Sequence, residues 1–233
     1  MDYNKLVLHH YPATRSVRVR WMLLETIGND FEIRRVDLYG GAQYEPEFLA
    51  LNPNHNVPAL EIHWSEGDVQ VMLESAAIVE WLADSFPEKG LAPRLDEGRK
   101  RAEYLHYLHF GATWMDMMLW QIRAHRHILK ADEADPRTVD RYENKFRSEC
   151  EPQIAGRLEH GDYILGSAFS AADVIIGHNV FWARGYGLCQ DEIFDNYLSR
   201  LMARTAMQHA LDDLAGFSLE PSDAAPVRLS FTG

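Results

Sequence analysis

The sequence predicts an α/β N-terminal half with the element order β-α-β-α-β-β-α, followed by an all-α C-terminal half. Every segment with strand-like alternation lies before Ser75. A short stretch that contains proline and glycine follows, and beyond it apolar residues recur only at helical spacing. We therefore expect an α/β domain at residues 1–87, a linker at 88–94, a helical domain at 95–218 and a loosely ordered tail at 219–233.

The first elements alternate between strand and helix. Residues 5–10 (KLVLHH) are short and β-prone, and residues 15–27 carry apolar side chains at helical spacing up to a stop at Gly28. Residues 31–38 (FEIRRVDL) alternate like a second strand. The crossover between the two strands is long enough for a parallel pair.

A short helix, a hairpin and a capped helix complete this half. Residues 44–53 give the short helix, which ends at a proline. Residues 57–63 (VPALEIH) and 69–74 (VQVMLE) are two strands, and the short WSEGD connection between them requires an antiparallel hairpin. Residues 75–87 form a helix with Ser75 as the expected N-cap. One small mixed sheet with helices on both faces follows from this order.

The second half consists of long helical stretches. They cover residues 97–129, with a bend expected near Gly111, and then residues 135–161, 169–187 and 194–214. No strand pattern recurs among them, so this half is predicted to be all-α.

Composition narrows the range of partners. The chain has 233 residues, a formal net charge of −12 and a pI of about 5.3, which disfavours binding to nucleic acid or anionic membrane. No apolar run approaches the length of a membrane span, and the first ten residues do not resemble a signal peptide. Cys150 and Cys189 are far apart, so we expect a reducing, cytoplasmic setting.

Three local motifs, taken with this element order, resemble the glutathione S-transferase superfamily over roughly residues 5–215. They are NVPAL, LESAAIVEWLAD and FSAADVIIG. The first half would be the thioredoxin-like domain of that family. The third motif places Ser170 and Asp173 at capping-box spacing, for which we expect a structural role only.

The first motif contains a proline where a strand should begin. The family places a cis-proline there, which turns the backbone of the preceding residue outward so that a peptide can pair with it. The resemblance therefore implies that Val57 and Pro58 hold the cysteinyl backbone of glutathione. The lysine that commonly meets the glycyl carboxylate is replaced by Asn56, and His55 replaces a glycine, so weaker glutathione binding is expected.

The second motif begins with Glu74 and Ser75. A helix N-terminus attracts a carboxylate through its free N–H groups and its partial positive charge. By the resemblance, Ser75 would receive the γ-glutamyl carboxylate, and Glu74 would meet the α-ammonium group. The alternative is an ordinary N-cap beside a solvated acid.

Three hydroxyl groups compete for the catalytic position between the first strand and the first helix. Thr14 lies four residues before Arg18, which is similar to the bacterial, theta-like Ser/Thr pattern. We rank Thr14 first, Ser16 second and Tyr11 third as the group that stabilises the glutathione thiolate. Thr14 as a simple helix cap is the main alternative. No cysteine lies in this turn, which argues against a mixed disulfide with the protein.

The resemblance also implies a pocket for the second substrate. Tyr11, Trp114 and Met118 are the expected contacts, because methionine and tryptophan suit an adaptable apolar site. Core packing is the alternative for each of these residues. His125 and His127 do not point the same way on a helix, so we expect no metal.

The resulting expectation is a cytoplasmic, homodimeric glutathione transferase for detoxification, with glutathione as co-substrate and a small, apolar or aromatic electrophile. Alternatives are another glutathione-dependent reaction on the same fold, namely isomerisation, dehalogenation or disulfide reduction, or a non-catalytic protein-binding relative.

Overall fold

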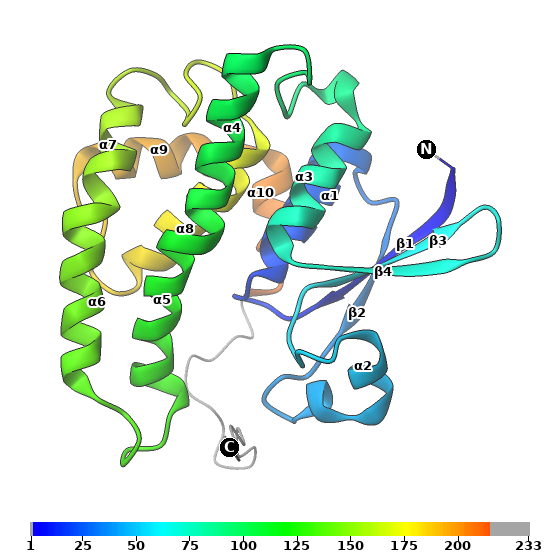
Figure 1. Ribbon diagram of the computed structural model, residues 1–233, viewed down its shortest axis with the longest axis horizontal. Helices are drawn as coiled ribbons and strands as arrows, with labels where there is room; N and C mark the ends of the chain where they lie inside the picture. The colour runs from blue at the N-terminus through cyan, green and yellow to red at the C-terminus, as the bar shows by residue number, and fades with distance from the viewer. Residues whose placement is uncertain (1, 215–233) are drawn as a thin grey trace.

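A four-stranded mixed sheet forms the first part of the chain in the computed structural model, which describes residues 2–214 (Figure 1). The strands are β1 (Tyr3–His10), β2 (Glu32–Arg35), β3 (Ala59–Trp64) and β4 (Val69–Leu73), in the spatial order β2-β1-β3-β4. β2 pairs with β1 in parallel, whereas β3 is antiparallel to both β1 and β4. The predicted fold class, the parallel crossover and the hairpin are confirmed.

The helices follow the predicted order as well. They are α1 (Ser16–Ile27), α2 (Pro46–Leu51), α3 (Ser75–Ser85), α4 (Gly98–Phe110), α5 (Asp116–Arg123), α6 (Pro136–Glu149), α7 (Glu151–Leu158), α8 (Ala171–Arg184), α9 (Glu192–Met202) and α10 (Thr205–Ala210). Short 3-10 turns lie at Ala42–Tyr44 and Pro87–Lys89, and π-helical segments lie at Gly111–Met115 and Ala124–Ile128. Within residues 2–214, none of the helices is long and apolar enough to cross a membrane.

The two faces of the sheet carry different side chains because successive residues of a strand point in opposite directions. Leu6 and Leu8 of β1 belong to the large core that includes α1 and α3. His9 instead contacts Phe48 of α2, with ring centroids 5.7 Å apart. Figure 1 shows α2 on the opposite side of the sheet from α1 and α3.

Strand β2 is shorter than predicted. Only Glu32–Arg35 pairs, although the alternating pattern covers residues 31–38. The strand lies at the edge of the sheet, where β1 is its one neighbour, and its side chains are exposed. Beyond the strand, Val36 is buried and its N–H donates a 2.9 Å hydrogen bond to the carbonyl of His10, and the chain then turns toward α2.

Helix α8 is the centre of the helical part and packs against α1, α3 and α4. Its N-terminus carries the predicted capping box, in which Asp173 accepts a hydrogen bond from the Ser170 N–H at 2.9 Å. Asp173 also accepts bonds from the Ile164 N–H and the Tyr197 hydroxyl, each at 2.9 Å. A fully buried carboxylate is stabilised only with several donors of this kind.

The π-helical segment at Gly111–Met115 packs against α8. A Cβ atom added at Gly111 would be 2.8 Å from Cδ1 of Ile176 and 2.9 Å from Cγ2 of Ile175. The carbonyl of Gly111 accepts a hydrogen bond of 2.7 Å from the Asn179 side chain. Because glycine has no side chain, α8 can pack directly against the π-helical segment, and the Asn179 side chain can bond to the backbone of that segment.

Candidate active site

A cleft of about 360 Å³ lies between the end of β1, the loop before β3, and helices α5 and α8. It is lined by Tyr11, Ala13, Thr14, Arg15, Leu38, Tyr39, Gln43, Tyr44, Asn54, His55, Asn56, Val57, Trp120, Arg123, Ile128, His178 and Trp182. The lining therefore combines the turn after β1, the loop before the predicted cis-proline and one wall from the helical part.

The turn between β1 and α1 brings Thr14 to the cleft. Its hydroxyl donates a 2.7 Å hydrogen bond to the carbonyl of Tyr11 and lies 2.8 Å from the hydroxyl oxygen of Ser16. Ala13 has a positive φ of 54°, and its carbonyl accepts a 3.1 Å bond from Arg123. The helical part thus holds the conformation of the turn that carries Thr14.

Ser16, the second candidate for the catalytic hydroxyl, is fully buried and does not line the cleft. Its Oγ accepts a 3.1 Å bond from the Tyr11 N–H and lies 2.7 Å from Nδ1 of His10. Tyr11 does line the cleft, with Arg35 over its ring at 5.3 Å, and burial raises the pKa of its hydroxyl. Of the three hydroxyls, Thr14 and Tyr11 face the space that a ligand can enter.

The loop before β3 carries the predicted glutathione contacts. The Val57–Pro58 peptide bond is cis, as predicted. Val57 is buried and lines the cleft together with the exposed Asn56 and His55. Asn52 fixes this loop by donating hydrogen bonds to the Asn56 carbonyl at 2.8 Å and to the Asn56 side-chain oxygen at 2.9 Å.

The start of α3 differs from the prediction. Glu74, with φ 68°, occupies the N-cap position, while Ser75 is already the first helical residue, so Ser75 is not the cap. The Ser75 hydroxyl accepts a 3.2 Å bond from Arg18, because a buried guanidinium needs acceptors on all sides. Glu74 is exposed, and neither residue is part of the cleft lining.

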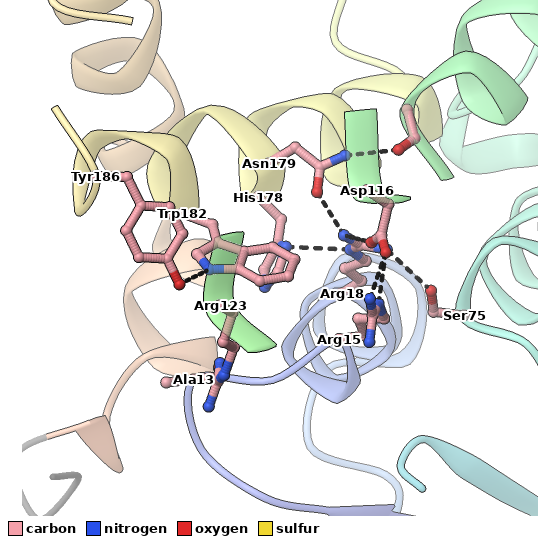
Figure 2. Close-up of polar contacts among 11 residues, drawn as sticks. Ala13, Arg15, Arg18, Ser75, Asp116, Arg123, His178, Asn179, Trp182 and Tyr186 are labelled. Atoms are coloured by element: carbon pink, nitrogen blue, oxygen red, sulfur yellow. Dashed lines mark hydrogen bonds and ion pairs between the residues drawn. The ribbon is translucent and has the colours of Figure 1, made fainter. Parts of the chain in front are cut away.

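Figure 2 shows the buried polar network around Arg18, which is 1% exposed. Arg18 donates to Asp116 at 2.6 Å, to Asn179 at 2.5 Å and to Nδ1 of His178 at 3.1 Å. The same Asp116 carboxylate accepts from Arg15 at 2.5 and 2.8 Å. Two guanidiniums and one carboxylate leave one net positive charge beside the cleft.

The charges of this network shift two pKa values. Burial alone would raise the pKa of Asp116, but Arg18 and Arg15 outweigh it and lower that pKa to about 2. Burial and the neighbouring Arg18 hold the pKa of His178 well below its usual value. His178 is therefore a neutral imidazole at physiological pH, and its Nδ1 is free to accept the bond from Arg18.

The helical wall of the cleft is aromatic and cationic. Arg15 lies over the rings of Trp120 and Trp182 at 5.0 and 5.6 Å. The indole N–H of Trp182 donates a 3.0 Å bond to the hydroxyl of Tyr186, which orients the ring (Figure 2). Together with Arg123, these side chains give the cleft two guanidiniums, and no carboxylate is among the lining residues.

Two residues expected in this wall lie elsewhere. Met118 is fully buried, with its sulfur 3.9 Å from that of Cys150. Trp114 donates to Glu149 at 3.1 Å and lies under Lys145 at 4.8 Å, on the side of α6. The π segment at Gly111–Met115 changes the residue spacing, so a face counted at 3.6 residues per turn is misplaced beyond it.

Several residues that line the cleft were not predicted from the sequence as functional candidates. These are Arg15, Arg123, His178 and Trp182. His178 and Trp182 are four residues apart on the buried helix α8, and polar or amphipathic side chains at that spacing in an otherwise apolar helix were a usable signal. No such signal pointed to Arg123, because its contact is the carbonyl of Ala13, which lies 110 residues away in the sequence.

No metal centre is found among residues 2–214, since no group of three or more histidine, cysteine or acidic side chains is placed to hold an ion. Both cysteines are buried, and burial raises their thiol pKa values. Neither lines the cleft, so in the described residues no protein thiol is available there.

Comparison with known proteins agrees with this architecture. The family model described as glutathione S-transferase, N-terminal domain, matches residues 14–85. Glutathione S-transferase 3 of Zea mays is 32% identical over 175 residues, covering 72% of this chain and 73% of that protein. The N-terminal part is thus of the glutathione S-transferase type, and the chain belongs to the glutathione S-transferase family.

Two further relatives carry names that describe different activities. The disulfide-bond oxidoreductase YfcG of Escherichia coli is 28% identical over 194 residues, 82% of this chain and 87% of that protein. A glutathione transferase from Burkholderia graminis, solved with two glutathione molecules bound per subunit, is 27% identical. It superimposes with a TM-score of 0.78 over 90% of this chain and 88% of its own.

Proposed function

We propose that this chain is a glutathione transferase that conjugates the glutathione thiolate to a small electrophile in the cleft described above. One observation carries the proposal. The Thr14 hydroxyl, the Asn56–Val57 loop and two guanidiniums converge on a single space whose lining contains no carboxylate. This is an environment for a peptide thiol that has to lose its proton.

The chemistry depends on the pKa of the bound thiol. A free thiol has a pKa of about 8.5, so little of it is ionised at neutral pH. In the proposal, the Thr14 hydroxyl contacts the sulfur, and the net positive charge of Arg15, Arg18 and Asp116 favours the anion. Each tenfold increase in the thiolate fraction requires about 1.4 kcal/mol of preference for the charged form.

In the proposal, the contacts of glutathione follow the resemblance to the family. Val57 would offer its backbone to the cysteinyl unit and Asn56 would meet the glycyl carboxylate, and both residues line the cleft. Glu74 and Ser75 remain in the proposal as contacts of the γ-glutamyl end, beyond the lining of the cleft. The exposed carboxylate of Glu74 supports this assignment, because it is accessible to an ammonium group.

The second substrate would lie against the helical wall. Trp120 and Trp182 support an apolar or aromatic electrophile, because their faces offer large contact areas. Reduction of a glutathione-containing disulfide is the second candidate reaction. Arg15 and Arg123 favour it, since a second peptide would bring carboxylates to an acid-free cleft.

The cytoplasmic, homodimeric state and the division into domains at 1–87 and 95–218 belong to the same proposal. Light scattering on the purified protein tests the dimer. Limited proteolysis tests the linker at 88–94, where cleavage between the two domains is expected.

The activity test compares conjugation of glutathione to an aromatic chloride with reduction of a mixed disulfide of glutathione. Thr14→Ala should lower kcat/KM for the preferred reaction about ten- to hundredfold, because a hydrogen bond to an anion is worth roughly 1.5–3 kcal/mol. Thr14→Ser keeps the hydroxyl and should retain most activity. Equal activity in Thr14→Ala and wild type would remove Thr14 from the mechanism, and absence of both reactions in the wild type would refute the proposed function.

A further inference from the structure

Behind Thr14, a chain of polar contacts leads away from the cleft into the protein. The Thr14 and Ser16 hydroxyl oxygens lie 2.8 Å apart, and the Ser16 oxygen lies 2.7 Å from Nδ1 of His10. The other ring nitrogen of His10, Nε2, lies 3.0 Å from a carboxylate oxygen of Asp213. Ser16 and His10 are 0% and 1% exposed, so water does not interrupt this sequence of groups.

The hydrogen bonds of Asp213 and His10 determine where the protons of the neutral His10 ring and of Ser16 point. Asp213 forms an ion pair of 2.8 Å with Arg20, and although burial acts against ionisation, His10 and Arg20 lower the pKa of Asp213. The carboxylate therefore accepts the Nε2 proton of His10. In a neutral imidazole, Nδ1 is then unprotonated and accepts the hydroxyl proton of Ser16.

The network also accommodates a protonated His10. Its Nδ1 would then donate to Ser16, whose own proton turns to the carbonyl of Tyr11 at 3.1 Å. Ser16 thus has an acceptor for its proton in either state. A serine hydroxyl with a purely structural role would need an acceptor for its proton in only one protonation state of His10.

We infer that Thr14, Ser16 and His10 form a proton relay that removes the thiol proton of the bound substrate, with Asp213 stabilising the imidazolium that results. This inference rests on the proposed function, because it assumes that a glutathione-type thiol lies at Thr14. His10 and Asp213 act through Thr14 and Ser16, and are positioning residues rather than catalytic ones.

The transfer is balanced in protons. The thiol S–H bond breaks and its proton binds to Oγ1 of Thr14, while the former Thr14 proton turns from the Tyr11 carbonyl and passes to Oγ of Ser16. The Ser16 proton in turn binds to Nδ1 of His10. The products are a thiolate that accepts a hydrogen bond from Thr14, and an imidazolium paired with Asp213. After substitution, the leaving group departs as an anion, and the imidazolium returns its proton along the relay to water.

The charged groups around His10 agree with this role. Asp213 contacts the ring from the segment after α10, and Arg20 of α1 contacts Asp213. On β2, Arg35 is paired in register with His10, but its guanidinium lies over the ring of Tyr11. The direct ionic contact of the imidazole is thus the carboxylate of Asp213, which can pair with an imidazolium.

The test measures the thiolate absorbance of enzyme-bound glutathione against pH. Asp213→Asn and His10→Gln should each raise the pKa of the bound thiol by about one unit, a tenfold loss of thiolate at neutral pH. The pH–rate profile of kcat/KM should move alkaline by the same amount. Ser16→Ala should behave in the same way, since it interrupts the relay between Thr14 and His10.

Matched controls are available beside His10 and Asp213. His9 is also buried and also pairs with a carboxylate, Glu61 at 2.6 Å, but it faces α2. Asp212 is exposed and adjacent to Asp213. His9→Gln and Asp212→Asn should leave the thiol titration at its wild-type position. Circular dichroism establishes that each variant is folded, and Asp213→Asn keeps the test decisive if His10→Gln fails to fold.

The possible outcomes distinguish a failure of the proton relay from a failure of the proposed function. If wild type binds glutathione and lowers its thiol pKa while Asp213→Asn and Ser16→Ala titrate like wild type, the relay is refuted and the proposed function stands. If His9→Gln shifts the titration as much as His10→Gln, the effect is structural and the relay is also refuted. If wild type neither binds glutathione nor lowers its thiol pKa, the proposed function fails, and the relay with it.

Discussion

Replacing Asp116 with asparagine removes the carboxylate that Arg15 and Arg18 share. The pKa of Asp116 is lowered from 3.8 to about 2 in the folded protein, because the two guanidiniums outweigh the effect of burial. At about 1.36 kcal/mol per pKa unit, ionisation of this group adds about 2.5 kcal/mol to the free energy of unfolding at neutral pH. Asparagine resembles the protonated carboxyl, so Asp116→Asn should cost about that amount at pH 7.

The sign of the pH dependence follows from the direction of the shift. A carboxyl group with a lowered pKa stabilises the folded state above its unfolded pKa, and this stabilisation is lost as the pH falls toward the folded pKa. About 1 kcal/mol of the contribution of Asp116 should be gone by about pH 3. The difference in stability between wild type and Asp116→Asn should therefore shrink by the same amount between pH 7 and pH 3.

Urea unfolding at fixed protein concentration measures both quantities, with circular dichroism as the signal. Other acidic groups titrate equally in wild type and variant, so their effects cancel in the difference. Asp140→Asn, at an exposed position, is the control and should change stability little at either pH. A difference between wild type and Asp116→Asn that stays constant from pH 7 to pH 3 would refute the assignment of the stabilisation to the ionised carboxylate.

Two further predictions concern the proposed substrate contacts. Ser75→Ala should destabilise the protein by about 1–3 kcal/mol, because Arg18 loses an acceptor, and should raise the glutathione Kd in calorimetry; an unchanged Kd in a folded variant would exclude Ser75 from the site. Trp182→Ala should raise KM for an aromatic electrophile about two- to tenfold, in line with the roughly 0.5–1.5 kcal/mol of an aromatic contact. Trp114→Ala should leave that KM unchanged, and equal effects of the two tryptophan variants would contradict the placement of the cleft.

The features that the sequence predicted well depend on local signals. The cis bond before Pro58 and the capping box of Ser170 and Asp173 are each encoded within a few residues. Thr14 was ranked first among three hydroxyls from its position before the first helix; it lines the cleft together with Tyr11, and its catalytic role stays a prediction. Such features need only the turn chemistry of a short segment, which the sequence displays directly.

The features that the sequence missed depend on contacts between distant segments. Ser75 was assigned to the helix cap, but its hydroxyl accepts a bond from Arg18, 57 positions away. The contact of His10 with Asp213 spans 203 positions. Trp114 was misplaced for another reason, since one π segment is enough to shift the face of a helix, and hydrophobic spacing gives no warning of it.

The close approach at Gly111 has a consequence for how the sequence can vary. An alanine there would place its Cβ atom 2.8 Å from Ile176 and 2.9 Å from Ile175, a distance that neither branched side chain tolerates without moving. A relative with a larger residue at this position therefore needs smaller ones at the two isoleucine positions. The helix carrying them also carries Asn179, which bonds both the Gly111 carbonyl and Arg18. Substitution of this one glycine would thus be expected to accompany substitutions on α8, about 65 positions further along the helical half of the chain.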